Sequence, residues 1–113
     1  MTNAKIRMFG ITLTATALVA TSLLTAPVRS EDKSAALFKQ KCAACHGADG
    51  KADTPTGKSM KVRGFADPAV AKMSDEDLAG VIDKGKGKMP GYGKSMKPDE
   101  IKAMVAFVRS LAK

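Results

Sequence analysis

Residues 41–51, KCAACHGADGK, contain both cysteines and the only histidine of this 113-residue chain. Cys42 and Cys45 are three residues apart, and His46 follows the second cysteine directly. In a helix, residues three apart lie on the same side, so both thiols can reach one ligand. The next residue can then place an imidazole beneath that ligand. The spacing therefore indicates metal binding, redox cycling or cofactor attachment.

Three kinds of site use cysteine and histidine at such short spacing. A structural zinc site needs four ligands, and the chain offers only these three. A thioredoxin-like disulfide motif needs a strand–helix–strand context, and no convincing strand is predicted. The remaining interpretation is covalent attachment of haem, for which C-x-x-C-H is the signature. Cys42 and Cys45 would then form thioethers at the porphyrin edge, and His46 would bind the iron.

The second axial position of such a haem decides its function. An open position allows gas binding or peroxide chemistry, whereas a second strong ligand leaves electron transfer. No second histidine exists, so methionine is the natural candidate. Met89 lies in a glycine-rich loop and is followed by Pro90. Glycines permit close approach of the backbone and proline fixes the turn, so Met89 is the predicted ligand.

The other methionines of the exported chain are interpreted differently. Met73 flanks a predicted helix and Met104 lies in the apolar stripe of another, so both are expected to fill the core. Met60 and Met96 remain the alternatives to Met89.

The periodicity of the chain predicts helices separated by long loops. Residues 34–44 are predicted to be helical, with Ser34 or Asp32 as the cap. Phe38, Cys42 and Cys45 recur at helical spacing on one face of that segment. Residues 47–64 are polar and rich in glycine, and are predicted to form an ordered loop.

Two further helices follow. Ser74 resembles the start of a capping box, and Gly85 is the expected C-terminal cap of the helix that it opens. Residues 85–97 lack periodicity, and the last helix is expected to begin at Pro98. Its apolar face consists of Ile101, Met104, Val105, Val108 and Leu111. The predicted fold class is all-α with long loops, and such loops usually wrap a ligand or carry function.

The N-terminal residues 1–30 are interpreted as a secretory signal peptide. Lys5 and Arg7 form a basic start, and residues 8–28 carry no charge. Cleavage is expected after Ser30, with Ala26 as the alternative and an uncleaved membrane anchor as the competing interpretation. The remaining residues, 31–113, form one haem domain, expected in the periplasm or in an equivalent compartment such as the thylakoid lumen.

Charge and composition restrict the partners. Cleavage removes three of the 19 basic residues and none of the 11 acidic ones, which leaves a net charge of about +5. Tryptophan is absent and only one tyrosine is present, so nucleic acid is not an expected partner. Five lysines surround Met89: Lys84, Lys86, Lys88, Lys94 and Lys97. They are interpreted as a rim that docks an acidic redox partner, the alternative being a loop kept soluble by charge.

Three segments carry a resemblance to a known family. FKQKCAACH, KMPGYG and PDEIKAMVAFVRSLAK resemble class I c-type cytochromes, and among them the small cytochrome c6-like group. The resemblance covers residues 33–111 and implies a cytochrome c fold, with helices and long loops wrapped around one covalently attached haem. It implies that the first and last helices cross at Phe38 and Phe107. It also implies that the carbonyl of Pro55 accepts a hydrogen bond from the second nitrogen of His46. Lys97 departs from the family pattern, because lysine cannot accept amide hydrogen bonds at a helix cap.

The pocket is expected to be lined by residues from all of these segments. Tyr92 is the polar member of the set, with surface packing as its alternative role. The expected lining residues are Leu37, Phe38, Val62, Phe65, Leu78, Ile82, Tyr92, Met104 and Phe107.

The sequence thus predicts a monomeric single-electron carrier, not an enzyme, with one haem c held by Cys42 and Cys45 and ligated by His46 and Met89. Its expected partners are an oxidase, a photosynthetic reaction centre or a dehydrogenase. Membrane contact is expected only through these partners or an uncleaved signal. The rivals are a five-coordinate haem protein that binds gas or reduces peroxide, and a haem-free interaction module.

Overall fold

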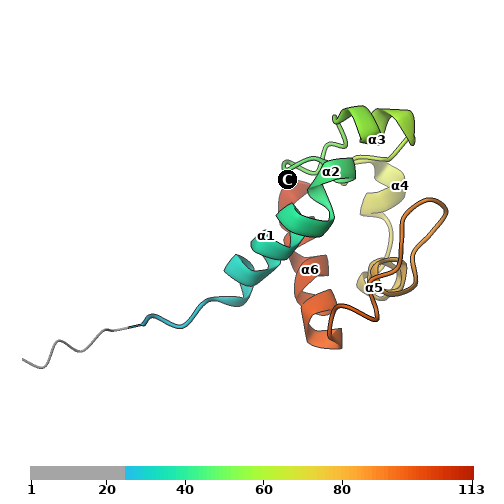
Figure 1. Ribbon diagram of the computed structural model, residues 1–113. Helices are drawn as coiled ribbons and strands as arrows, with labels where there is room; N and C mark the ends of the chain where they lie inside the picture. The colour runs from blue at the N-terminus through green and yellow to red at the C-terminus, as the bar shows by residue number, and fades with distance from the viewer. Residues whose placement is uncertain (1–24) are drawn as a thin grey trace, which may run out of the picture.

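A computed structural model describes residues 25–113 of the chain. Most of the predicted signal peptide, residues 1–24, therefore lies outside the described residues. The described part is built from helices and loops (Figure 1). In chain order the helices are α1 (Ser30–Lys41), α2 (Ala43–His46), α3 (Pro55–Ser59), α4 (Pro68–Ala71), α5 (Asp75–Lys84) and α6 (Pro98–Leu111). Between residues 25 and 113 there is no strand, only an isolated bridge. The all-α prediction is confirmed.

The core forms where α1 lies against α6 (Figure 1). Phe38 on α1 is 3% exposed, and its ring lies 5.3 Å from that of Phe107 on α6, at an angle of 56°. A third ring, that of Phe65, approaches Phe38 edge-on at 6.0 Å. Such aromatic pairs contribute about 0.5–1.5 kcal/mol each beyond the burial of their area. The crossing at Phe38 and Phe107 is the one that the family resemblance implied.

The first helix differs from its prediction at both ends. It begins at Ser30, four residues before the predicted start at Ser34, which is buried. Glu31 and Asp32 in its first turn favour the positive end of the helix dipole. The helix stops at Lys41, because Cys42 has φ −118° and interrupts the helical path before α2 begins. The attachment motif thus lies at a break between two helices.

The caps of α5 agree with the sequence. The Ser74 hydroxyl accepts a hydrogen bond from the Asp77 amide at 3.0 Å. Gly85 ends the helix with φ +81°, and a Cβ there would lie 2.5 Å from the carbonyl oxygen of Met89. Only glycine therefore fits at this position without moving the backbone of the Met89 loop.

Only one of the two hydrogen bonds of a capping box forms at the start of α6. The Lys97 side chain accepts nothing, as the sequence predicts, but its backbone amide donates to the Glu100 carboxylate at 2.8 Å. This is half of a capping box, with the acidic residue at the third helical position as the contributing side chain. Behind it, four of the five residues of the predicted apolar face are buried, with Met104 only 1% exposed, and Leu111 is half-buried.

Two one-turn helices, α3 and α4, lie in segments where no helix was predicted. Each begins with proline, after a capping side chain. Thr54 accepts from the Gly57 amide, and Asp67 accepts from the Ala69 amide at 2.8 Å. A capping residue followed by proline favours such a start, and the pairs Thr54-Pro55 and Asp67-Pro68 carry that signal.

Arg109 connects α6 to the turn between α4 and α5. Its guanidinium donates to the Met73 carbonyl at 2.5 Å and to the Ala71 carbonyl at 3.4 Å. It also contacts the Asp75 carboxylate at 3.0 and 3.1 Å. Because residues 71–75 lie far from Arg109 in the sequence, this contact belongs to the tertiary fold alone.

Candidate cofactor site

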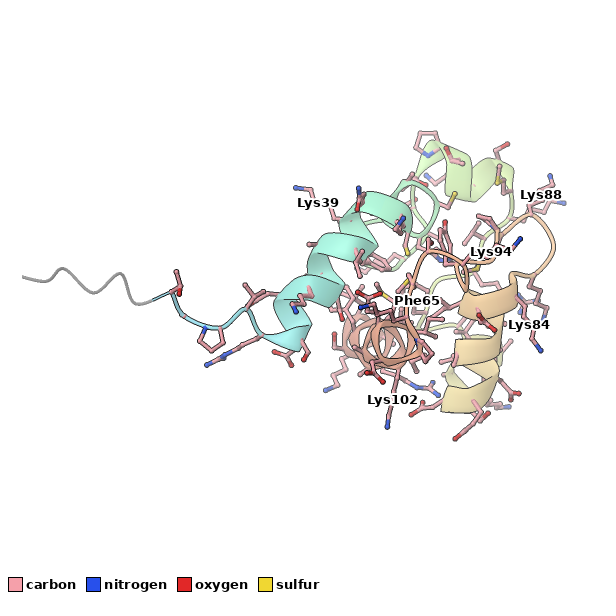
Figure 2. All side chains as sticks on the ribbon, turned by 60° about the horizontal axis from the view of Figure 1, so that its bottom comes forward. Lys39, Phe65, Lys84, Lys88, Lys94 and Lys102 are labelled. Carbon is pink, nitrogen blue, oxygen red and sulfur yellow. The ribbon has the colours of Figure 1, made fainter. Side chains whose placement is uncertain are left out.

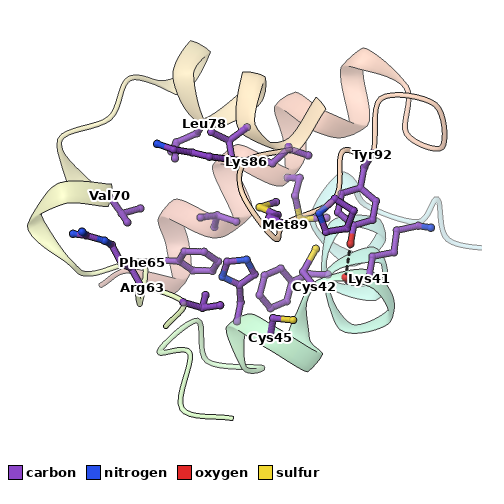
Figure 3. Close-up of a pocket in the computed structure, with 18 of the residues that line it drawn as sticks. Lys41, Cys42, Cys45, Arg63, Phe65, Val70, Leu78, Lys86, Met89 and Tyr92 are labelled. Carbon is purple, nitrogen blue, oxygen red and sulfur yellow. Dashed lines mark hydrogen bonds between the residues drawn. The ribbon is translucent and has the colours of Figure 1, made fainter. Parts of the chain in front are cut away.

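A cavity of about 510 Å³ opens among α1, α2, α5, α6 and the loops between them. Its volume lies in the range of roughly 300–1,000 Å³ typical of pockets for small ligands. Figure 3 shows Cys42 and Cys45 on one side of it, and Val70 and Leu78 on the other. Most lining side chains are apolar, and the polar ones are mainly basic. An apolar wall with a few donor atoms suits a large, flat, mostly hydrophobic cofactor.

The three residues of the attachment motif all line this cavity. Cys42 lies at the break between α1 and α2, and Cys45 and His46 lie in the single turn of α2. Both cysteines are free thiols and are partly buried. The structure therefore brings the two sulfur atoms and the imidazole to one wall, as the spacing predicted.

Burial sets the protonation states of these groups. It lowers the pKa of the His46 imidazole below its usual value, which leaves a neutral ring able to bind a metal. Burial also raises the pKa of the Cys42 thiol; nearby Lys41 opposes this shift and Cys45 adds to it. The residues present thus fit a haem, with neutral imidazole and two thiols beside an apolar cavity.

The predicted partner of the His46 ring is not observed. Among the described residues, His46 Nδ1 is the buried side-chain atom without a hydrogen-bond partner. Pro55, whose carbonyl the family resemblance assigned to it, is exposed and starts α3. The implied hydrogen bond is not observed between these residues, and the role of Pro55 beside the haem stays a prediction. The ring is instead stacked on Phe65, with centroids 4.9 Å apart and planes at 24°.

Met89 reaches the same cavity from the loop between α5 and α6. The loop closes on itself through two backbone hydrogen bonds between Lys86 and Met89, at 3.0 and 3.1 Å. It is also attached to the end of α5, where the Ile82 carbonyl accepts from the Tyr92 amide at 2.8 Å. Met89 is thus held by short-range contacts on both sides.

The alternative methionines differ in whether they line the cavity or lie in the core. Met96 is 4% exposed and packs in the core with Phe38 and Ile101, and it does not line the cavity. Met60 and Met73 do line it, and Met60 is 41% exposed. Of the alternatives raised by the sequence, only Met60 remains beside the cavity.

Tyr92 lies at the cavity and also makes a hydrogen bond that the sequence did not predict. Its ring lines the cavity, while its hydroxyl donates to the Lys41 carbonyl at 3.0 Å (Figure 3). This bond links the Met89 loop to the last residue of α1, directly before Cys42. Burial raises the pKa of the Tyr92 hydroxyl, so the donor keeps its proton. Two other predicted lining residues, Leu37 and Phe107, pack against the core instead.

The mouth of the cavity is basic. Its lining residues include five basic side chains and no acidic one: Lys41, Lys61, Arg63, Lys86 and Lys88. Only Lys86 and Lys88 belong to the lysines singled out from the sequence. The others come from α1 and from the segment after α3, so the positive charge surrounds the opening from several elements.

The chain is similar in sequence and structure to known proteins. The family model described as "Cytochrome C oxidase, cbb3-type, subunit III" matches residues 29–108. The structure is similar to a solved structure described as "KustC0563 c-type cytochrome", with 36% identity and a TM-score of 0.64. The match covers 71% of this chain and 98% of that one. It is also similar to the structure of a tyrosine-to-phenylalanine mutant of Kustc0563, with 38% identity and a TM-score of 0.62, covering 69% and 96% of the two chains. No curated protein matches the chain.

Two further findings concern metal-binding groups and membrane-spanning helices in residues 25–113. Within this range, no group of three or more His, Cys, Asp and Glu side chains could hold a metal ion. None of the helices in this part of the chain has the length and apolar character to span a bilayer.

Proposed function

Since the chain belongs to the cbb3-type cytochrome c oxidase subunit III family of c-type cytochromes, we propose that it is an exported single-electron carrier with His46 and Met89 as iron ligands. Family membership implies a haem c covalently bound through the cysteines, and a haem-based electron carrier rather than an enzyme. When bound, the haem supplies a one-electron couple between ferrous and ferric iron.

The observation that supports this proposal most is that His46 and Met89 line one cavity from two separate segments of the chain. His46 belongs to the short α2, and Met89 belongs to a loop closed by its own hydrogen bonds. A buried neutral imidazole and a thioether are a ligand pair that favours electron transfer over gas binding.

Substitution of Met89 tests the ligand assignment. We expect Met89→Leu to abolish the weak far-red absorption band of sulfur bound to ferric iron and to lower the reduction potential. The reduced variant should also bind carbon monoxide, which the original protein should not. Met60→Leu is the matched control, because Met60 lines the same cavity. If Met89→Leu keeps the band and Met60→Leu loses it, Met60 is the ligand.

We further propose that the basic mouth of the cavity docks an acidic redox protein, such as an oxidase, a reaction centre or a dehydrogenase. The lysines Lys86 and Lys88 reach the cavity itself from the Met89 loop. Figure 2 shows Lys84 and Lys88 on the side of the α5–α6 loop, whereas Lys39 and Lys102 lie away from it. Complementary charge mainly accelerates association and makes it sensitive to salt.

A charge-matched comparison tests this docking surface. We expect the double variant Lys86→Glu/Lys88→Glu to associate about tenfold more slowly with an acidic redox partner at low salt. The variant Lys39→Glu/Lys102→Glu has the same net charge and should change the rate much less. Stopped-flow electron transfer at rising ionic strength measures both. Equal slowing of the two variants would show that only net charge matters.

We also propose export of the chain, with residues 1–30 as the signal peptide. The basic start and the uncharged stretch of residues 8–28 support this assignment. Mass spectrometry of the haem-stained protein from a periplasmic extract should give a chain that begins at Glu31. A chain that begins at Pro27 would place cleavage after Ala26, and a membrane-bound full-length chain would refute cleavage.

A further inference from the structure

The four-residue helix α2 contains Cys45 and His46. It is too short to provide hydrogen-bond partners for all of its own backbone carbonyl groups. The last carbonyl groups of any α-helix lack partners within the helix, and in a single turn this affects nearly every residue. The Gly47 amide donates to the Ala43 carbonyl at 2.9 Å, and the Ala52 amide donates to the His46 carbonyl at 2.7 Å. The two carbonyls between them, those of Ala44 and Cys45, need partners from elsewhere.

One side chain supplies that partner. The Thr54 hydroxyl lies 2.9 Å from the Ala44 carbonyl oxygen and 3.1 Å from that of Cys45, and it can donate to either. The same hydroxyl oxygen accepts from the Gly57 amide at 2.9 Å. Thr54 therefore caps the N-terminus of α3 and holds the C-terminal carbonyls of α2 with a single hydroxyl group.

Close backbone packing also strengthens the junction between α2 and α3. Gly57 is buried, and a Cβ on it would overlap the Cys45 carbonyl oxygen and lie 2.6 Å from that of Ala52. The backbone of α3 therefore lies directly against the turn that holds the cysteine. Since the peptide group after Cys45 leads into His46, any movement of this junction moves the imidazole as well.

We propose that Thr54 is a positioning residue for the iron ligand, acting through the Ala44 and Cys45 carbonyls on the orientation of His46. Its hydroxyl provides a fixed anchor for a turn whose imidazole has no hydrogen bond at Nδ1. The inference rests on the proposed ligation by His46 and adds a residue that lies outside the attachment motif of residues 42–46.

The experiment compares Thr54→Val, Thr54→Ser and Thr56→Val in the haem-loaded protein. Valine keeps the branched shape and removes the hydroxyl, whereas serine keeps the hydroxyl. Thr56 lies on the same short helix and is exposed, so it is the matched control. The readouts are the proton resonances of the His46 ring in the oxidised state, the reduction potential, and the ratio of folded to unfolded protein in urea.

We expect Thr54→Val to displace and broaden the His46 ring resonances and to change the potential, while Thr54→Ser restores both and Thr56→Val alters neither. Loss of the hydrogen bonds should also lower the folded-to-unfolded ratio by roughly 3–10-fold. A Thr54→Val protein that is less stable but has unchanged resonances and potential would overturn the positioning role.

A measurement on the original protein covers the case in which Thr54→Val does not fold. The Gly57 amide, bonded to the Thr54 hydroxyl, should exchange its hydrogen far more slowly than an unstructured peptide does. Free exchange at Gly57 would overturn the inference. Absence of iron-shifted His46 resonances in the original protein would instead refute the ligation by His46, while the exchange of Gly57 still tests the contact itself.

Discussion

Arg109 offers a direct test of how the α4–α5 turn is held against α6. The perturbation is Arg109→Met, which keeps much of the side-chain length and removes the guanidinium. Three acceptors lose their donor: the Asp75 carboxylate and the carbonyls of Met73 and Ala71. Met73 itself lines the cavity, so the turn forms part of the cavity wall.

The magnitude follows from the exposure of each contact. The Asp75 side chain is 72% exposed, so its ion pair with Arg109 should contribute less than about 1 kcal/mol. The bond to the Met73 carbonyl is short and part-buried, and a hydrogen bond to a charged donor contributes about 1.5–3 kcal/mol before screening by solvent. The Arg109 side chain is 34% exposed, which reduces that value. We expect a total loss of about 2 kcal/mol.

Urea denaturation of the haem-loaded protein measures this loss. With a slope of about 1–1.5 kcal/mol/M for a domain of this size, the midpoint should fall by roughly 1.5 M. Arg109→Lys should lose about half as much, because lysine keeps the charge but not the planar set of donors. Lys58→Met is the control: Lys58 forms a 2.7 Å ion pair with Asp53, but their side chains are 69% and 70% exposed. It should leave the urea midpoint nearly unchanged, because solvent screens an exposed ion pair.

Asp75→Asn separates the two kinds of contact at Arg109. It should cost less than about 1 kcal/mol, since the carbonyl bonds remain. If Asp75→Asn costs as much as Arg109→Met, the ion pair carries the interaction and our reasoning from exposure is wrong. If Arg109→Met leaves the midpoint within error of the original protein, the connection contributes nothing to stability.

Three further substitutions test the packing around the cavity. Phe38→Ala, at the crossing of α1 and α6, should cost about 3–5 kcal/mol of unfolding free energy in urea, and a loss below about 2 kcal/mol would contradict its place in the core. Gly57→Ala should cost about 1–3 kcal/mol, because its Cβ would overlap the Cys45 carbonyl; an unchanged thermal midpoint would contradict that close approach. Tyr92→Phe should cost up to about 1 kcal/mol of unfolding free energy in urea, through loss of the bond to the Lys41 carbonyl, while the far-red band should persist.

Local signals were enough to predict several elements of this fold. Ser74 and Gly85 mark the ends of α5 because capping depends on side chains within a few residues of the helix end. Pro98 marks the start of α6 for the same reason. The Thr54-Pro55 pair carries a similar local signal at the start of α3.

The sequence also predicts the chemical groups of the site. Cys42, Cys45 and His46 lie within five residues, so their spacing alone predicts that they meet on one wall. The glycines and proline around Met89 likewise predict a tight loop, and the structure closes that loop with its own hydrogen bonds. The role of Met89 as ligand stays a prediction.

Contacts between distant segments were decided by the tertiary structure alone. Whether the hydroxyl of Thr54 or the carbonyl of Pro55 meets the attachment turn depends on how the loop after His46 folds back, and short-range preferences do not determine that path. Arg109 contacts the α4–α5 turn only because α6 packs against α5. Met96 and Met60 lie in equally polar surroundings in the sequence, yet one is buried in the core and the other lies at the cavity. Residue type and spacing determine local geometry, whereas burial depends on which faces the folded chain brings together.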